Sequence, residues 1–132
     1  MAKAKKADEL IITTPNEVGT LSHITDALFS SGISILHLSA YARGESAYFM
    51  VITDNNEKAA EMIKDMGYKV INKQALIIEF ENRPGALAPV AKKLSDNGID
   101  IEYIFATSAD GRKVLGIIST NNDDMAFELI NE

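Results

Sequence analysis

The stretch that decides the fold occurs twice, as LIITTPNEVGTLSHITDALFSSGISI at residues 10–35 and as LIIEFENRPGALAPVAKKLSDNGIDI at residues 76–101. A shift of 66 residues, the distance from Leu10 to Leu76, aligns the two stretches without a gap. Self-similarity at a fixed distance indicates a supersecondary unit that occurs more than once. The sequence of 132 residues is therefore interpreted as two copies of one unit.

Both copies predict the same order of elements. A β-rich run, at 9–14 in copy one and 75–81 in copy two, leads into a polar loop with glycine and then into apolar residues at helical spacing. Beyond Gly32 and Gly98, alternating apolar residues predict a strand, a tight turn and a returning strand. Clusters of Asn and Asp then provide caps for a second helix.

These elements predict an α+β protein of two ferredoxin-like βαββαβ units, each with an antiparallel sheet and helices on one face. The units are expected at residues 9–73 and 74–132, after a flexible basic tail at 1–8. In copy one, residues 68–72 form the last strand. Copy two stops at the residue aligned with Met66, so it lacks that strand. We expect another segment or a second chain to fill the open position.

Composition argues against several classes of function. The chain has no cysteine, which removes thiolate metal sites and cysteine nucleophiles and suits the cytoplasm. A net charge of −6 disfavours nucleic acid as a partner, and no apolar run is long enough to cross a membrane. His23 and His37 are the only histidines, and neither has a second metal ligand at suitable spacing, so no metal site is expected. A packing role is favoured for His37.

Copy two carries two short motifs, Asn82-Arg83-Pro84-Gly85-Ala86-Leu87 and Asn97-Gly98-Ile99-Asp100-Ile101. Together they resemble the signature of the ACT domain family, a set of regulatory modules, and copy one matches more loosely. The resemblance implies binding of a free amino acid or similar small metabolite where two such domains meet, without catalysis and without a cofactor. A homo-oligomer, most simply a dimer, or a regulated enzyme is the implied partner.

In ACT domains the ligand typically lies between the loop after the first strand of one domain and the start of the second strand of its neighbour. Carried over residue by residue, the resemblance implies ligand contacts from Asn16, Val18, Gly19, Thr20, Leu21 and Ser34 in copy one, and from Asn82, Arg83, Pro84, Gly85, Ala86, Leu87 and Asp100 in copy two. Copy one has Glu17-Val18 in place of Arg83-Pro84. Because Glu17 would repel a carboxylate, we expect the two loops to bind unequally.

The loop has chemistry of its own that suits such a ligand. Glycine allows close approach of the backbone, and the first N–H groups of the following helix can hold a carboxylate. Backbone amides near Gly85 would bind the α-carboxylate, Asn82 would add a donor and an acceptor, and Asp100 would pair with the ammonium.

Three alternatives stay open. In the first, the glycines only shape a turn, the asparagines satisfy its backbone, and no ligand binds. The second is an adaptor or dimerisation module that works through exposed sheet edges. The third, an acylphosphatase-like hydrolase, is disfavoured because the chain lacks a glycine-rich cradle beside Asn82 and Arg83. Ferredoxin-like folds carry unrelated functions, so the fold alone does not choose among these.

Overall fold

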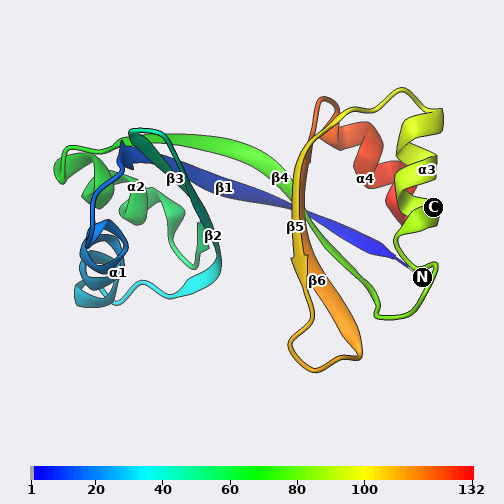
Figure 1. Cartoon of the computed structure of the whole chain (residues 1–132), viewed down its shortest axis with the longest axis horizontal. Coiled ribbons are helices and arrows are strands. Elements are labelled where there is room, and N and C mark those ends of the chain that lie inside the picture. The colour runs from blue at the N-terminus through cyan, green and yellow to red at the C-terminus, as the bar shows by residue number, and fades with distance from the viewer. Residues whose placement is uncertain (1) are drawn as a thin grey trace. The chain divides into compact units, whose positions relative to one another are not determined.

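The computed structural model describes residues 2–132, which divide into two compact units. The first unit is Asp8–Lys73, and the second joins residues 2–7 to Gln74–Glu132. Within residues 2–132 there are six strands and four helices (Figure 1), with these bounds: β1 Lys3–Pro15, α1 Thr20–Ser30, β2 Ile35–Arg43, β3 Ser46–Thr53, α2 Asn56–Asp65, β4 Lys69–Glu81, α3 Ala88–Asp96, β5 Ile101–Thr107, β6 Lys113–Thr120 and α4 Asp123–Asn131.

The first unit has strand order β2-β3-β1-β4, the order of a ferredoxin-like sheet. Strands β1 and β3 pair antiparallel with Leu10 opposite Val51, and β2 joins β3 through a tight hairpin. Helices α1 and α2 cover one face of the sheet. Their apolar residues Ile24, Leu28 and Ile63 are buried against the strand residues of that face. This is the predicted α+β architecture.

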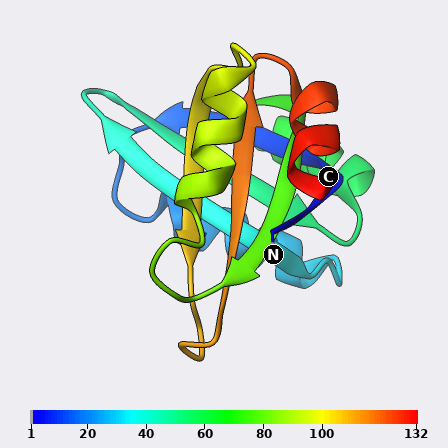
Figure 2. The same cartoon turned by 90° about the vertical axis from the view of Figure 1, so that its right-hand side faces the viewer.

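The second unit repeats this arrangement with strand order β1-β4-β6-β5. Strands β4 and β6 pair antiparallel with Leu76 opposite Ile118, and Figure 2 shows α3 and α4 over one face of the sheet. Val90, Leu94 and Ile130 fill the space between these helices and the sheet. Equivalent asparagines start the second helix of each copy: Asn55 accepts from the Lys58 amide at 3.2 Å, and Asn122 from the Met125 amide at 3.1 Å.

Residues 69–81 form one strand, β4, where the sequence predicts two strands with a short break. Neither glycine nor proline occurs between Lys69 and Glu81, so nothing interrupts the extended backbone. The division between the two units lies between Lys73 and Gln74, inside this strand. Strand β1 is divided in the same way, between Ala7 and Asp8.

The prediction of a flexible tail over residues 1–8 is wrong for residues 3–8, which belong to β1; Met1 lies outside the described residues. The 66-residue shift places Lys3–Pro15 on Lys69–Glu81, so the repeat extends further back than predicted. Ala2 and Ala4 pack against the core of the second unit, while Lys3 and Lys5 are exposed. Alternation built on alanine and lysine is a weak strand signal, so the local pattern does not reveal this strand.

The N-terminal part of β1 occupies the position that copy two leaves open. Helix α4 ends at Asn131, next to the last described residue, Glu132. Residues 2–7 pack within the second unit, and its sheet order places β1 beside β4, where a ferredoxin-like unit has its last strand. The sequence predicts that another segment or a second chain fills the open position. The structure confirms the first alternative, because residues 2–7 of the same chain lie there.

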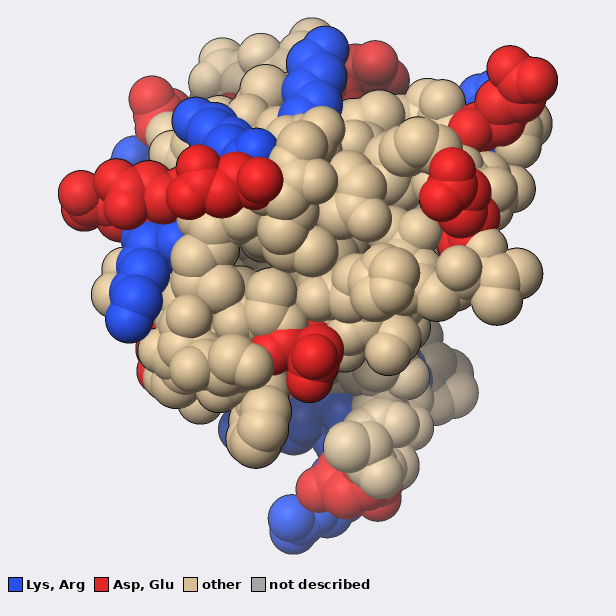
Figure 3. Space-filling model, turned by 90° about the vertical axis from the view of Figure 1, so that its left-hand side faces the viewer, with Lys and Arg blue, Asp and Glu red and all other residues tan. Residues whose placement is uncertain are grey.

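Charged side chains of both signs occur together on the surface of the first unit. On the face in Figure 3, which shows the side with α1 and α2, the Lys and Arg side chains lie beside Asp and Glu and are separated by wide uncharged areas. Among residues 2–132, no helix has the length and hydrophobicity needed to cross a membrane.

Candidate functional site

The glycine loop of copy one is tied to the hairpin of its own unit. The Asn16 amide donates to the carbonyl oxygen of Glu45 at 2.8 Å, and the Asn16 side chain donates to that of Gly44 at 3.2 Å. Gly19 has a φ of 93°, a left-handed conformation that side chains rarely adopt, and α1 begins directly after it. These two hydrogen bonds fasten the start of the loop to the hairpin between β2 and β3.

The loop of copy two is anchored in the same way. The Asn82 amide donates to the Arg112 carbonyl oxygen at 2.8 Å, and its side chain donates to that of Gly111 at 3.0 Å. Both asparagines therefore satisfy turn backbone, which is the structural alternative raised from the sequence. Any role of Asn16 or Asn82 in ligand binding stays a prediction, and it would use the side-chain oxygen or the second N–H of the side-chain amide.

The two loops differ where the helix begins. In copy one, α1 starts at Thr20, and Gly19 provides no side-chain cap for its first amides. In copy two, α3 starts only at Ala88, and the Ala86 amide already donates to the Arg83 carbonyl oxygen at 3.2 Å. Gly85, Ala86 and Leu87 therefore precede α3, and carboxylate binding by the amides near Gly85 stays a prediction.

Of the remaining loop residues, most face solvent. Thr20 is buried, and its hydroxyl donates to the Glu17 carbonyl oxygen at 3.1 Å. Ala86 is half-buried. Every other member of the predicted set is exposed: Asn16, Val18, Gly19, Leu21, Ser34, Asn82, Arg83, Pro84, Gly85, Leu87 and Asp100. Exposed apolar side chains such as Val18 and Leu21 have contact area to offer to a ligand or a second molecule.

Ser34 and Asp100 lie at the opposite end of their sheets from the glycine loops. In the first unit, Pro15 pairs with Ser46 at one end of β3, and Ile35 pairs with Thr53 at the other. Seven residues of strand separate these pairs, which corresponds to roughly 24 Å. A site that uses both Gly19 and Ser34 therefore needs a second ACT-like unit.

The same separation holds in the second unit, where Glu81 pairs with Lys113 and Ile101 with Thr120. The Asp100 backbone is fixed by Asn121 through two hydrogen bonds of 3.0 Å, which leaves the exposed Asp100 carboxylate outside that contact. Asp100 therefore cannot meet a ligand at the Gly85 loop of its own unit.

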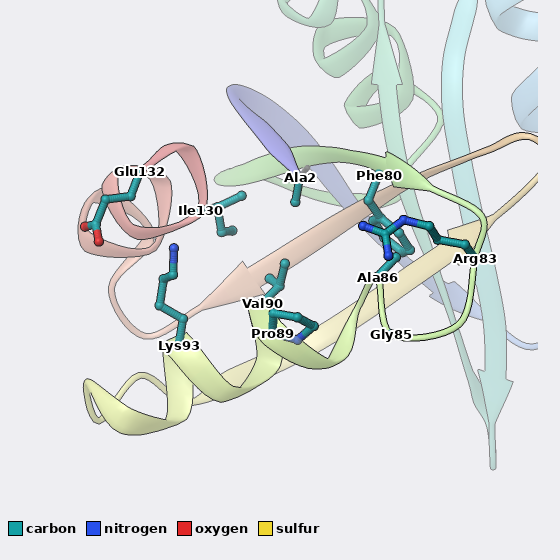
Figure 4. A pocket seen from close by; sticks show the side chains of 10 residues that line it. All are labelled: Ala2, Phe80, Arg83, Gly85, Ala86, Pro89, Val90, Lys93, Ile130 and Glu132. Atoms are coloured by element: carbon teal, nitrogen blue, oxygen red, sulfur yellow. The ribbon is translucent and has the colours of Figure 1, made fainter.

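A pocket of about 180 Å³ lies beside the Gly85 loop, within the second unit (Figure 4). Three residues of the predicted site, Arg83, Gly85 and Ala86, line it. The other lining residues are not predicted from the sequence: Ala2, Phe80, Pro89, Val90, Lys93, Ile130 and Glu132. The helical spacing of Val90 predicts that it is buried, but not that it lines a pocket. Ala2 and Ile130 lie at the pocket through tertiary packing, which no local pattern predicts.

Two cations border this pocket. The Arg83 Nε donates to the Glu81 carboxylate at 3.1 Å, and the guanidinium extends over the pocket. The Lys93 Nζ donates to the Leu129 carbonyl oxygen at 3.0 Å, and the Glu132 side chain lies on the same side as Lys93 (Figure 4). The arrangement offers an apolar wall with a positive group at each side, which suits a small anion that has an apolar part.

His37 lies on β2 of the first unit, away from the Gly19 loop. Burial lowers its pKa below the ordinary 6.5, because the uncharged ring is favoured where water is excluded. Its Nε2 lies 3.0 Å from the Ser39 hydroxyl. Among residues 2–132, no group of three or more potential ligand side chains could hold a metal ion.

Comparison with known proteins identifies the family of this arrangement. Residues 6–132 match the family described as an ACT domain pair. No curated protein sequence matches the chain. Protein BT0572 from Bacteroides thetaiotaomicron is similar in structure, with a TM-score of 0.86 and 28% identity over 96% of this chain and 87% of that one.

A regulatory subunit of aspartate kinase and part of an aspartokinase share the fold at lower identity. The ligand-free regulatory subunit from Thermus thermophilus has a TM-score of 0.66 and 18% identity over 98% of this chain and 93% of that one. Escherichia coli aspartokinase III, solved in complex with lysine and aspartate, has a TM-score of 0.61 and 9% identity over 97% of this chain and 31% of that one.

Proposed function

Because the chain belongs to the ACT domain pair family, whose domains are regulatory and non-catalytic modules, we propose that it senses a free amino acid or a similar small metabolite. The ligand would bind at the glycine loops, where an ACT unit meets another. The family match supports a regulatory role. The likeness in fold to the aspartate kinase regulatory subunit agrees with it. We propose the class of ligand and the loops that bind it.

The observation that carries the proposal is the position of Arg83, Gly85 and Ala86. These residues combine a glycine in the left-handed region, a guanidinium group and the edge of a pocket of about 180 Å³. Guanidinium groups bind carboxylates through paired hydrogen bonds, and an amino acid always carries a carboxylate. The loop of copy one has Glu17 at the aligned position, which supports stronger binding by copy two.

The separation of the glycine loops from Ser34 and Asp100 supports a site completed by a second molecule. Strand β2 is an edge strand of the sheet in the first unit, and β5 is an edge strand of the sheet in the second. Each has a neighbouring strand on one side only. Leu36, on the β2 edge, is 65% exposed. Edge strands with exposed apolar side chains pair readily with a second copy, so a homodimer is the proposed assembly.

The proposed output is a change in a regulated enzyme. The Thermus thermophilus relative is described as a regulatory subunit, a separate chain, and this chain matches 93% of its length. A stand-alone sensor would act in the same way, by altering its contacts with an enzyme when the ligand binds.

A thermal-shift screen of the twenty amino acids and related metabolites tests the proposal. Since any ligand that binds the native state raises its stability, one or a few of them should raise the melting temperature. Gly85→Val should abolish that shift. Gly67→Val is the matched control, because Gly67 and Gly85 have similar positive φ values, 91° and 81°, and a Cβ at either position would have no neighbouring atom within 4 Å.

The two variants should lose similar stability, and only Gly85→Val should lose binding. A flat screen would instead favour the adaptor function, in which exposed edges act without a small ligand. Binding that survives in Gly85→Val would show that the loop is not the site.

A further inference from the structure

Most of the residues that line the pocket beside Arg83 lie outside the glycine-loop motif. Phe80 at the end of β4, Val90 on α3 and Ile130 on α4 form its apolar wall, and Ala2 forms part of the wall beside the sheet (Figure 4). All of these residues belong to the second unit. The pocket is therefore complete in one unit, whereas the proposed interface site needs two.

Comparison with copy one shows what keeps this space open. Under the 66-residue shift, Ala2 aligns with Tyr68, which packs against the core of the first unit. The same shift places Arg83 on Glu17 and Lys93 on Ala27. Copy one thus has a large aromatic side chain and no cations where copy two has a methyl group and two cations.

The charges around the pocket orient a ligand. On one side, the Arg83 guanidinium uses its Nε for Glu81, and its two terminal nitrogens are the groups that bind a carboxylate in a paired arrangement. On the other side, Lys93 is engaged with the Leu129 carbonyl oxygen, and the Glu132 side chain would repel a second anion. A single carboxylate at the Arg83 side fits this pattern.

We propose that this pocket binds a compact monocarboxylate with an apolar body, whose carboxylate pairs with Arg83 and whose body lies on Phe80, Val90 and Ile130. A cavity of about 150 Å³ holds a benzene molecule, so a pocket of this size takes roughly six to ten non-hydrogen atoms. The inference rests on the proposed function, because it specifies the ligand's chemistry and places its apolar part in copy two. It requires no ammonium group on the ligand.

The experiment measures binding of three probes of one shape by titration calorimetry and thermal shift. 4-Methylpentanoate carries the carboxylate alone, leucine adds the ammonium, and 4-methylpentanamide has no charge. 4-Methylpentanoate should bind and raise the melting temperature, and the amide should bind about tenfold or more weakly, because it cannot make charge-assisted hydrogen bonds with Arg83.

Two substitutions locate the site. Ala2→Tyr copies the residue of copy one and should abolish binding of 4-methylpentanoate, while Ala2→Leu, which adds less volume, should weaken it less. Arg83→Gln should weaken binding about tenfold or more. Arg112→Gln is the matched control, because Arg112 is also exposed and paired with a carboxylate, Asp110 at 3.0 Å, but does not line the pocket.

The outcomes separate this inference from the proposed function. 4-Methylpentanoate binding that is absent, or unchanged in Ala2→Tyr and Arg83→Gln, would overturn the inference, and leucine binding by the parent would leave amino-acid sensing in place. Pocket-dependent binding of 4-methylpentanoate, with no amino acid bound, would support the inference and narrow the proposed function to a small metabolite that is not an amino acid. Absence of binding by every probe and every amino acid would overturn both. Far-ultraviolet circular dichroism and the melting temperature without ligand identify a variant that has lost its fold. If Ala2→Tyr does not fold, the binding measured for Ala2→Leu is used in its place.

Discussion

Ala4 and Asn131 hold each other through two reciprocal hydrogen bonds. The Ala4 amide donates to the Asn131 side-chain oxygen at 2.8 Å, and the Asn131 side-chain nitrogen donates to the Ala4 carbonyl oxygen at 3.0 Å. The two residues are 127 positions apart, so the contact joins the first strand of the chain to its last helix. It fastens the N-terminal segment into the sheet position that copy two leaves open.

Asn131→Ala should therefore destabilise the second unit. Loss of both hydrogen bonds should lower the free energy of unfolding by about 1 kcal/mol, because the contact is exposed and water replaces part of it. Urea denaturation measures the change. Asn97→Ala is the control, since Asn97 is also an exposed asparagine at a helix end but bonds only within its own helix, to the Lys93 carbonyl oxygen. Equal losses in the two variants would mean that the strand contact adds nothing.

The ion pair of Lys6 with Asp124, 2.8 Å long, should make this attachment depend on pH. The hydrogen bond from Lys6 holds the pKa of Asp124 below its ordinary 3.8, and the same bond raises the pKa of Lys6 above 10.5. A lowered carboxyl pKa contributes stability above about pH 3.8 that is lost as the pH falls through the folded-state pKa. A raised lysine pKa contributes stability below about pH 10.5 that is lost as the pH rises through the folded-state pKa.

Asp124→Asn should consequently be less stable than the parent at pH 6, and the difference should shrink as the pH is lowered below roughly 3.8. Urea midpoints at a series of pH values measure it. Asp26→Asn, on α1 of the first unit, changes the net charge equally and should show no such trend. A difference between Asp124→Asn and the parent that stays constant down to pH 2.5 would contradict the assignment.

Gly116→Ala should be costly, because β5 and β6 approach closely at this position. A Cβ on Gly116 would lie 2.7 Å from the Ala106 Cβ and would overlap the Phe105 carbonyl oxygen. Since Gly116 is buried and pairs with Ala106, the strands must separate, at a cost of about 2 kcal/mol. Thermal and urea unfolding report the loss, and adding Ala106→Gly should restore only part of it. A stability equal to that of the parent would show that the strands relax freely.

Much of the fold follows from local pattern. The aligned apolar residues of 10–12 and 76–78 predict the first strand of each copy, and the stop glycines at 32 and 98 predict the helix ends. These features are predictable because periodicity and glycine conformation act over a few neighbouring residues. The equal caps at Asn55 and Asn122 have the same origin.

The features that local pattern does not predict depend on residues far apart in the chain. Lys3, Ala4 and Lys5 carry little strand signal, and the contacts that hold their strand come from Asn131 and the core of copy two, which are distant in sequence. The late start of α3 at Ala88 has no signal in the apolar spacing, because Leu87 fits the helical period although it precedes the helix. Periodicity identifies a helix better than it identifies its first residue.

For the candidate site, sequence alone determined the repeat, the two glycine loops and the charge difference between Arg83 and Glu17, because these are properties of aligned positions. Only the tertiary structure decided that Gly19 and Ser34 lie at opposite ends of one sheet, and that Ala2 and Ile130 close a pocket beside Arg83. Strand register and side-chain packing set those distances, and both depend on contacts between residues that no local pattern relates.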